Sequence, residues 1–150
     1  MTEHQLGELQ LSTWRAFITA HATLVDVIDR ELTEAECIPL HWYDVLIELF
    51  EAPEHRLRLH ELARKVVLSR SGLTRLVDRL ETAGFLQRQA DTTDRRGSFA
   101  VITEEGIAAL RKAWPVYAQG ISRYFAQHLN DDEARLVAEL FNRMLRSHLL

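Results

Sequence analysis

Apolar residues recur every three or four positions along most of the chain, a spacing typical of amphipathic helices. The first such stretch covers residues 6–32 and is followed by Ile38-Pro39. Proline cannot continue a helix and disfavours helical geometry in the residue before it. A second stretch covers residues 40–51 and stops before Pro53. The pattern predicts one long helix and one shorter helix in the first third of the chain.

The next segment changes its apolar spacing twice. Residues 56–59 alternate between polar and apolar side chains as a strand does, and residues 60–66 return to helical spacing. A further helix is predicted to start at Ser69, a favourable N-cap, and to stop at Gly84, which suits the position after a last turn. Its apolar positions form one stripe that we expect to be buried: Leu73, Leu76, Val77 and Leu80.

After this helix the apolar period becomes two. Residues 85–89 and 98–102 flank the polar turn 91–97, which predicts a β-hairpin with a long basic tip. Together with the helices on either side, the hairpin predicts a mostly α protein with one small antiparallel β-sheet.

Two more helices are predicted after the hairpin. Thr103 is placed to cap the first, and Pro115 should kink this helix without ending it. Asn130 and Glu133 have the spacing of a capping box, which opens the last helix. One side of the first helix is expected to carry a narrow apolar seam: Ile107, Leu110, Trp114, Tyr117, Ile121, Tyr124 and His128.

Composition restricts the class of protein. The chain has 150 residues, of which 47% are apolar and 27% charged, values ordinary for one soluble domain. No apolar run is long enough to cross a bilayer, and the N-terminus lacks the pattern of a signal peptide. The single cysteine, Cys37, excludes an intramolecular disulfide and fits a reducing compartment. We therefore expect a cytoplasmic protein that does not enter the membrane.

Charged residues are unevenly distributed, although the net charge is only −4. Residues 1–55 contain 2 Lys/Arg against 11 Asp/Glu, residues 56–102 contain 10 against 5, and residues 103–150 contain 6 of each. A net charge of +5 therefore lies in one block of the chain. Such a local excess is typical of a surface that binds a polyanion while the remainder has another role.

Two short helices followed by a hairpin form the pattern of a winged helix-turn-helix, here over about residues 56–102. A helix fits the major groove of DNA, where each base pair presents a distinct set of donors and acceptors. With the apolar stripe of the 69–84 helix buried, its other side is predicted to face outward: Ser71, Thr74, Arg75, Asp78, Arg79 and Thr82, with Arg70 at the flank.

Position along this helix indicates a role for its polar residues. Arg70, Ser71, Thr74 and Arg75 lie near its start and are placed to meet base edges. Arg79 lies a turn further on and suits a phosphate.

The tip of the predicted hairpin adds a second basic element. Arg95 and Arg96 lie in its turn and suit a narrow minor groove, where negative potential is concentrated. A basic helix face is often merely solvated, and two arginines in a turn often have no role. Their coincidence in one helix-turn-helix-hairpin unit favours double-stranded DNA as the partner.

Several segments resemble the multiple-antibiotic-resistance regulator (MarR) family, and the likeness covers nearly the whole chain. The helical segments are Leu59-His-Glu-Leu-Ala63 and Ser69-Arg-Ser-Gly-Leu-Thr-Arg-Leu-Val-Asp-Arg-Leu-Glu81, followed by Gly84. The most specific part is Asp94-Arg-Arg96 followed by Ile102-Thr-Glu-Glu-Gly106. His60 departs from the pattern, because Ser or Thr is the more usual cap of the third helix.

The resemblance implies roles for wing residues and an assembly. Asp94 is implied to brace the wing while Arg96 enters the minor groove. The helices at about 6–32 and 103–149 are implied to form a homodimer that reads a pseudo-palindromic operator, commonly as a repressor. The sequence agrees independently, since these helices carry more apolar surface than a 47-residue reading head could cover. We expect one MarR-type domain over residues 1–150.

The resemblance also implies a pocket for a small effector, often aromatic or phenolic, between the dimerisation helices and the reading head. Six side chains are candidates for its lining: Trp14, Phe17, His21, Trp42, Tyr43 and Tyr117. The alternative for each is a place in the core or in the dimer interface. His21 is the most suggestive, because a buried imidazole needs a polar partner.

Other functions have less support. Glu36, Cys37 and His41 are ligand types for zinc, but no close pair such as His-x-x-x-His occurs, and the acidic neighbours of Cys37 argue against a redox sensor. No Gly-x-Ser-x-Gly motif or phosphate-binding Gly-x-x-x-x-Gly-Lys loop is present. We expect no catalytic residue, metal or cofactor. A protein-interaction adaptor is the main alternative to a DNA-binding regulator.

Overall fold

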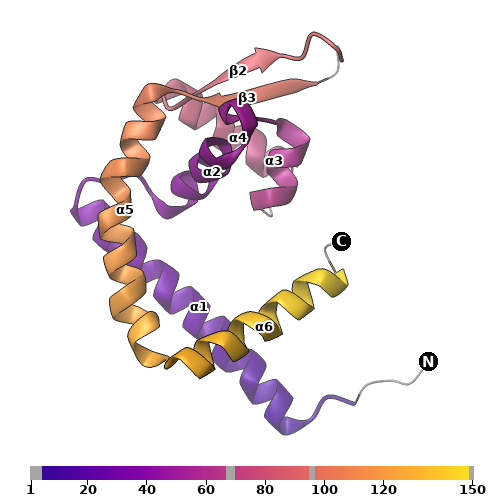
Figure 1. The fold of residues 1–150 in the computed structure, drawn as a ribbon, viewed down its shortest axis with the longest axis vertical. Coiled ribbons are helices and arrows are strands. Elements are labelled where there is room, and N and C mark those ends of the chain that lie inside the picture. Colours follow the sequence, from indigo (N-terminus) through magenta and orange to yellow (C-terminus); the bar gives the residue numbers. More distant parts are fainter. Residues whose placement is uncertain (1–4, 67–69, 95–96, 149–150) are drawn as a thin grey trace. The chain divides into compact units, whose positions relative to one another are not determined.

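The computed structural model describes residues 5–66, 70–94 and 97–148, apart from the side chains of Arg70 and His148 (Figure 1). The chain divides into two compact units, one made of residues 1–28 and 118–150 and the other of residues 29–117. We call them the terminal unit and the head unit. Among the residues described, no helix is both long and apolar enough to cross a membrane.

The terminal unit is built from helices with few buried side chains. α6 (Asp131–His148) lies beside α1 (Glu8–Glu34), and the rings of Phe17 and Phe141 are 5.2 Å apart (Figure 1). The predicted capping box is confirmed, because Asn130 and Glu133 each accept the backbone N–H of the other. Large apolar side chains stay exposed on both helices: Leu9, Trp14, Phe17, Ile18, Leu136, Phe141, Met144 and Leu145.

Hydrogen bonds of the backbone itself end α1 at Glu34, before Pro39. Glu36 has a φ of 57°, and the N–H of Cys37 donates to the carbonyl of Leu32 at 2.8 Å. This is the pairing of a Schellman motif, in which a left-handed residue closes the last turn. Ile38-Pro39 then leads into α2 (Leu40–Glu51), whose first N–H is capped by a carboxylate of α1, Asp29, at 2.8 Å.

Among the described residues, the head unit contains three complete helices, the end of α1, the start of the helix that follows the hairpin, and one sheet (Figure 1). α2 is followed by the short 3-10 turn η1 (Pro53–His55), β1 (Arg56–Arg58) and α3 (Leu59–Val66). α4 (Arg70–Thr82), β2 (Leu86–Ala90) and β3 (Ser98–Ile102) complete the helix-turn-helix and hairpin. The strands form one antiparallel sheet in the order β1-β3-β2. The predicted mostly α architecture with a small antiparallel sheet is confirmed.

Some expected details differ. α5 (Glu104–Tyr124) runs through Pro115 but ends before His128, which lies in a separate 3-10 turn, η2 (Ala126–His128). The expected seam therefore stops at Tyr124. His60 lies inside α3, not at its cap. The start of the fourth helix at Ser69 lies outside the described residues, while Gly84 closes that helix as predicted, with a φ of 86°.

The junction between hairpin and α5 gives a physical reason for the Thr-x-x-Gly motif. The Thr103 hydroxyl donates to the carbonyl of Gly84 at 2.7 Å and accepts the N–H of Gly106 at 3.1 Å. The predicted cap is therefore confirmed. A methyl group on Gly106 would overlap the carbonyl oxygen of Phe85 and lie 2.7 Å from Cγ1 of Ile102.

Gly106→Ala is therefore expected to destabilise the head unit by about 1–3 kcal/mol, because backbone must shift to admit the methyl group. Thermal unfolding followed by circular dichroism measures this loss. Gly7→Ala is the matched control, since the added methyl there meets only the end of the flexible Gln10 side chain. Equal melting temperatures for the wild type and Gly106→Ala would contradict the close approach.

Candidate nucleic-acid interface

α4 has one buried side and one exposed side, as the sequence predicts. The apolar stripe is buried in the head unit: Leu73, Leu76, Val77 and Leu80. The opposite side is exposed, and we call it the reading face: Ser71, Thr74, Arg75, Asp78, Arg79 and Thr82. The predicted division of this helix is confirmed. The face therefore presents two guanidinium groups and several hydroxyls from a rigid helix.

Within this face the arginine side chains start from different turns. Nε of Arg75 lies 3.4 Å from the carbonyl oxygen of Ser71, so its guanidinium is directed back along the helix toward the N-terminal end. The positive end of the helix dipole lies at that end, which also favours contact with a polyanion. Arg79 is exposed one turn further on. The geometry therefore brings the Arg75 side chain close to Ser71.

The hairpin is fixed to α4 by an arginine that was not predicted from the sequence. Arg88 of β2 donates to Asp78 and Glu81 of α4, at 2.9 Å for the Glu81 contact. Its backbone N–H also donates to Glu81 at 2.8 Å. The negative charge of Asp78 on the reading face is thereby compensated. The available signal was the pair of carboxylates on this helix, Asp78 and Glu81, followed by an arginine in the next strand.

The start of the hairpin turn is held by a buried carboxylate. Asp91 accepts from the N–H and hydroxyl of Thr93, at 2.9 and 2.7 Å, and from Nε of Arg58, at 2.9 Å. These bonds, the Thr93 ones first, lower the pKa of Asp91 well below its ordinary range. The stability gained from the ionised group is present above the ordinary pKa of about 3.9 and is lost as pH falls toward the lowered value.

The predicted wing residues are only partly described. Asp94 is exposed, and its carbonyl accepts the N–H of Gly97 at 3.1 Å. Arg95 and Arg96 lie outside the described residues, as does the side chain of Arg70. The pairing of Asp94 with Arg96 therefore stays a prediction.

A family model and a solved structure both match this chain. A model of the MarR family matches residues 40–98. A solved structure of Sco3205, a MarR-family transcriptional regulator from Streptomyces coelicolor in complex with DNA, has 30% sequence identity and a TM-score of 0.89. The match covers 97% of this chain and 91% of that one. This chain belongs to the MarR family.

Two curated relatives agree with this assignment. YkoM, an HTH-type transcriptional regulator from Bacillus subtilis, is 26% identical over 144 residues, which are 95% of this chain and 92% of the relative. PrsX, an HTH-type transcriptional regulator from Escherichia coli, is 36% identical over 110 residues, 71% of this chain and 63% of the relative.

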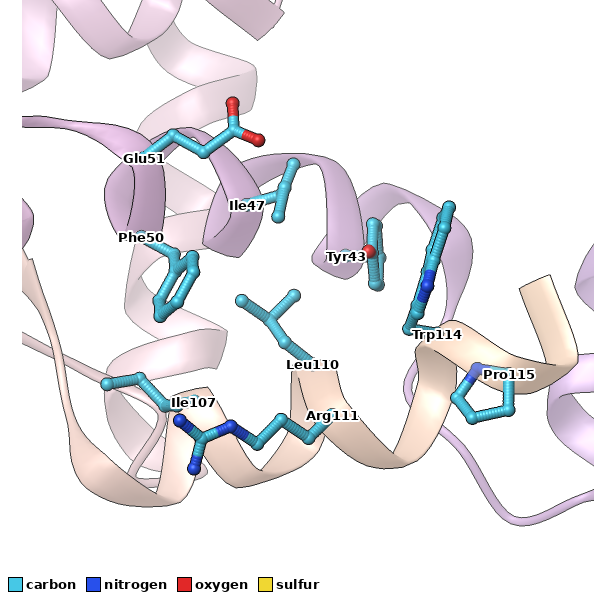
Figure 2. Close-up of a pocket in the computed structure, with 9 residues that line it drawn as sticks. All are labelled: Tyr43, Ile47, Phe50, Glu51, Ile107, Leu110, Arg111, Trp114 and Pro115. Carbon is cyan, nitrogen blue, oxygen red and sulfur yellow. The ribbon is translucent and has the colours of Figure 1, made fainter. Parts of the chain in front are cut away.

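This MarR-family chain also has an apolar cavity in its head unit, between α2 and α5 (Figure 2). Its volume is about 490 Å³. Leu110 points into the space between the helices, with Tyr43 and Trp114 at one end and Phe50 at the other (Figure 2). The full lining is Tyr43, Ile47, Phe50, Glu51, Ile107, Leu110, Arg111, Trp114 and Pro115.

Only one of the six predicted pocket residues, Tyr43, lines this cavity. Tyr117 contacts Tyr43 edge-on at 5.1 Å, and burial raises the pKa of both hydroxyls. Trp42 instead packs against Phe85, with ring centroids 6.0 Å apart.

The other three candidates, Trp14, Phe17 and His21, form a run of neighbouring rings in the terminal unit. His21 is exposed in the single chain, so the expected buried imidazole is not found there.

Most of the cavity lining was not predicted from the sequence, because the apolar seam of α5 was assigned to dimerisation. Ile107 and Leu110 belong to the predicted seam, but both are buried inside the head unit. A signal was available: their spacing from Trp114 places all three on one side of a helix whose first turns directly follow the hairpin. The first part of α5 therefore belongs with the head.

Proposed function

We propose that this chain is a homodimeric, sequence-specific transcriptional regulator that represses from a pseudo-palindromic operator and is controlled by a small aromatic effector. The observation that carries the proposal is the reading face of α4. It is polar and basic, it is exposed along the whole helix, and the opposite side is anchored in the core. A helix held in this way can enter a major groove without losing its own packing. Action on chromosomal DNA implies a place in the cytoplasm.

Contacts to DNA are assigned from position along the reading face and the wing. Ser71, Thr74 and Arg75, with Arg70 before them, meet base edges, and Arg79 binds a phosphate. Arg95 and Arg96 reach the flanking minor groove, with Asp94 bracing Arg96. The wing assignment rests on the family motif and on the local charge of +5 over residues 56–102.

Gel shifts with random genomic fragments at two salt concentrations test the DNA-binding function. Neutralising phosphates releases counterions, so affinity should fall by about 10³-fold or more between about 50 and 200 mM salt if six or more phosphates are contacted. A subset of fragments should remain bound at the higher concentration. A protein-interaction adaptor would retard no fragment at either salt concentration.

Dimerisation is supported by the apolar surface of the terminal unit. α6 is exposed along almost its whole length in the single chain, including Leu136, Met144 and Leu145. In proteins, most of the stability of an amphipathic helix comes from packing of its apolar side. A second copy of the chain covers such a surface symmetrically and presents two reading faces to the two half-sites.

The effector is assigned to the cavity between α2 and α5. Its volume of about 490 Å³ lies in the range of small-molecule sites, and its walls are aliphatic and aromatic. Arg111 and Glu51 supply the charged groups of the lining. A bound molecule alters DNA affinity only if it binds one arrangement of the dimer better than the other.

Binding of small aromatic probes should be visible in the fluorescence of Trp114. We expect phenol or benzoate to quench tryptophan emission in the wild type and in Trp42→Phe, the matched control away from the cavity. Trp114→Phe should remove this saturable quenching. Ile47→Phe should weaken probe binding by roughly tenfold by filling the cavity, while operator binding without a probe stays unchanged. Equal quenching in Trp114→Phe and Trp42→Phe would place the probe elsewhere.

A further inference from the structure

Two arginines of the edge strand β1 extend across the sheet. Arg56 and Arg58 are two residues apart, so their side chains leave the strand on the same face. Both guanidinium groups lie over the ring of Phe99 on the central strand β3, with their Cζ atoms 4.3 and 5.1 Å from the ring centroid. The ring thus supports two cations from a neighbouring strand.

Beyond the ring, Arg56 bonds to β2, the hairpin strand with which β1 does not pair, and Arg58 bonds to Asp91, the residue that follows β2. Nη1 of Arg56 donates to Oε1 of Gln89 at 2.8 Å, and Nε of Arg58 donates to Oδ2 of Asp91 at 2.9 Å. The sheet order is β1-β3-β2, so these bonds pass over one strand. We call this group the arginine clasp: Arg56, Arg58, Phe99, Gln89 and Asp91.

The clasp ends on the residue that starts the wing loop. Asp91 directly follows β2, and its side chain is 3% exposed while Thr92, Thr93 and Asp94 are exposed. Its Oδ1 accepts hydrogen bonds from Thr93. Its Oδ2, which accepts from Arg58, would lie 3.5 Å from a methyl group placed on Gly97. Asp91 therefore lies against both stems of the loop.

The other end of the clasp is joined to the helix-turn-helix without an intervening loop. α3 begins at Leu59, directly after Arg58, and Nη1 of Arg58 also lies 3.8 Å from Glu61 in the first turn of α3. A shift of β1 must therefore move α3 and the wing stems together. Sheet stability alone would not require bonds that pass over a strand to a loop residue.

We propose that the arginine clasp sets the position of the wing relative to α4, and that Arg58 and Asp91 are positioning residues for the minor-groove contact. The inference rests on the proposed function, in which the wing touches DNA. Freezing the wing stems in advance lowers the ordering cost of binding. The clasp acts through the wing, so neither Arg58 nor Asp91 needs to contact DNA.

Hydroxyl-radical footprinting on a selected operator fragment tests the proposal. Arg58→Met and Asp91→Asn should each lower affinity about tenfold, and the double variant should lose little more, because both remove the ion pair between Arg58 and Asp91. Protection should disappear at the flanking minor groove and persist at the half-sites that α4 covers. Arg58→Lys should restore part of the flanking protection. Arg135→Met is the matched control, because it removes an exposed ion pair with Asp132 in the terminal unit.

Additive losses, or a uniform loss of protection over the whole footprint, would overturn the proposal, since both indicate general destabilisation. If Arg58→Met does not fold, Asp91→Asn carries the same comparison, because the amide keeps the size of the side chain and one acceptor. Arg96→Ala distinguishes a failure of the clasp from a failure of the wing contact. A loss for Arg96→Ala with none for Arg58→Met contradicts only the clasp, whereas no effect of Arg96→Ala contradicts the wing contact in the proposed function.

Discussion

Replacing Arg75 with alanine is expected to weaken operator binding by about 1–3 kcal/mol and to relax base preference at one operator position. The guanidinium is exposed on the second turn of α4, directed toward Ser71 at the N-terminal end. A side chain in this position meets base edges when the helix enters the major groove, and a bidentate contact to a base discriminates against the other three. Binding isotherms on the operator and its single-base variants measure both effects.

Arg79→Ala is the matched variant, because Arg79 lies on the same face one turn further from the helix start. It should weaken specific and random DNA alike and lower the salt slope by about one, as expected for a lost phosphate contact. Equal losses on specific and random DNA for both variants would refute the assignment of Arg75 to a base.

Removal of residues 130–150 is expected to leave insoluble or unfolded protein. This segment contains α6, whose apolar residues Leu136, Met144 and Leu145 are exposed in the single chain and are expected to pack against a second copy. Without α6, Phe17 of α1 also loses its ring contact with Phe141. Expression, solubility and sedimentation of the truncated chain measure the outcome. A folded, DNA-binding monomer from this truncation would contradict the dimer.

A point variant separates dimerisation from folding. Met144 is 57% exposed, so a glutamate there costs a monomer little, but it would place a charge in the dimer interface. Met144→Glu should raise the dimer dissociation constant by roughly tenfold to hundredfold. Asn142→Glu adds the same charge on the opposite side of α6 and should leave the dimer intact.

Local patterns predicted local structure well. The buried stripe of α4, the caps at Thr103 and Asn130, and the glycine that closes α4 follow from spacing and from the chemistry of helix ends. Each depends on residues a few positions apart. The basic reading face followed from the same spacing, because burial of one side of a helix fixes what the other side presents.

Features that depend on distant residues were not predicted. The pairing of β1 with β3 brings Arg58 to Asp91, 33 positions away. The contact of Arg88 with the carboxylates of α4 depends on how the hairpin folds back onto that helix. The cavity was missed for a related reason. The spacing of apolar residues on α5 does not indicate whether they pack against another chain or against α2. In the structure, Ile107 and Leu110 are buried in the head unit.

The most direct test of the central claim is selection of genomic fragments by the purified full-length protein, followed by sequencing of the retained fragments. The account predicts one enriched inverted repeat, with half-sites about one helical turn apart, bound by two chains. It also predicts that Arg75→Ala changes the enriched sequence at one symmetric pair of positions. Retention of fragments without a shared sequence, or a motif without two-fold symmetry, would contradict a dimer that reads an operator through α4.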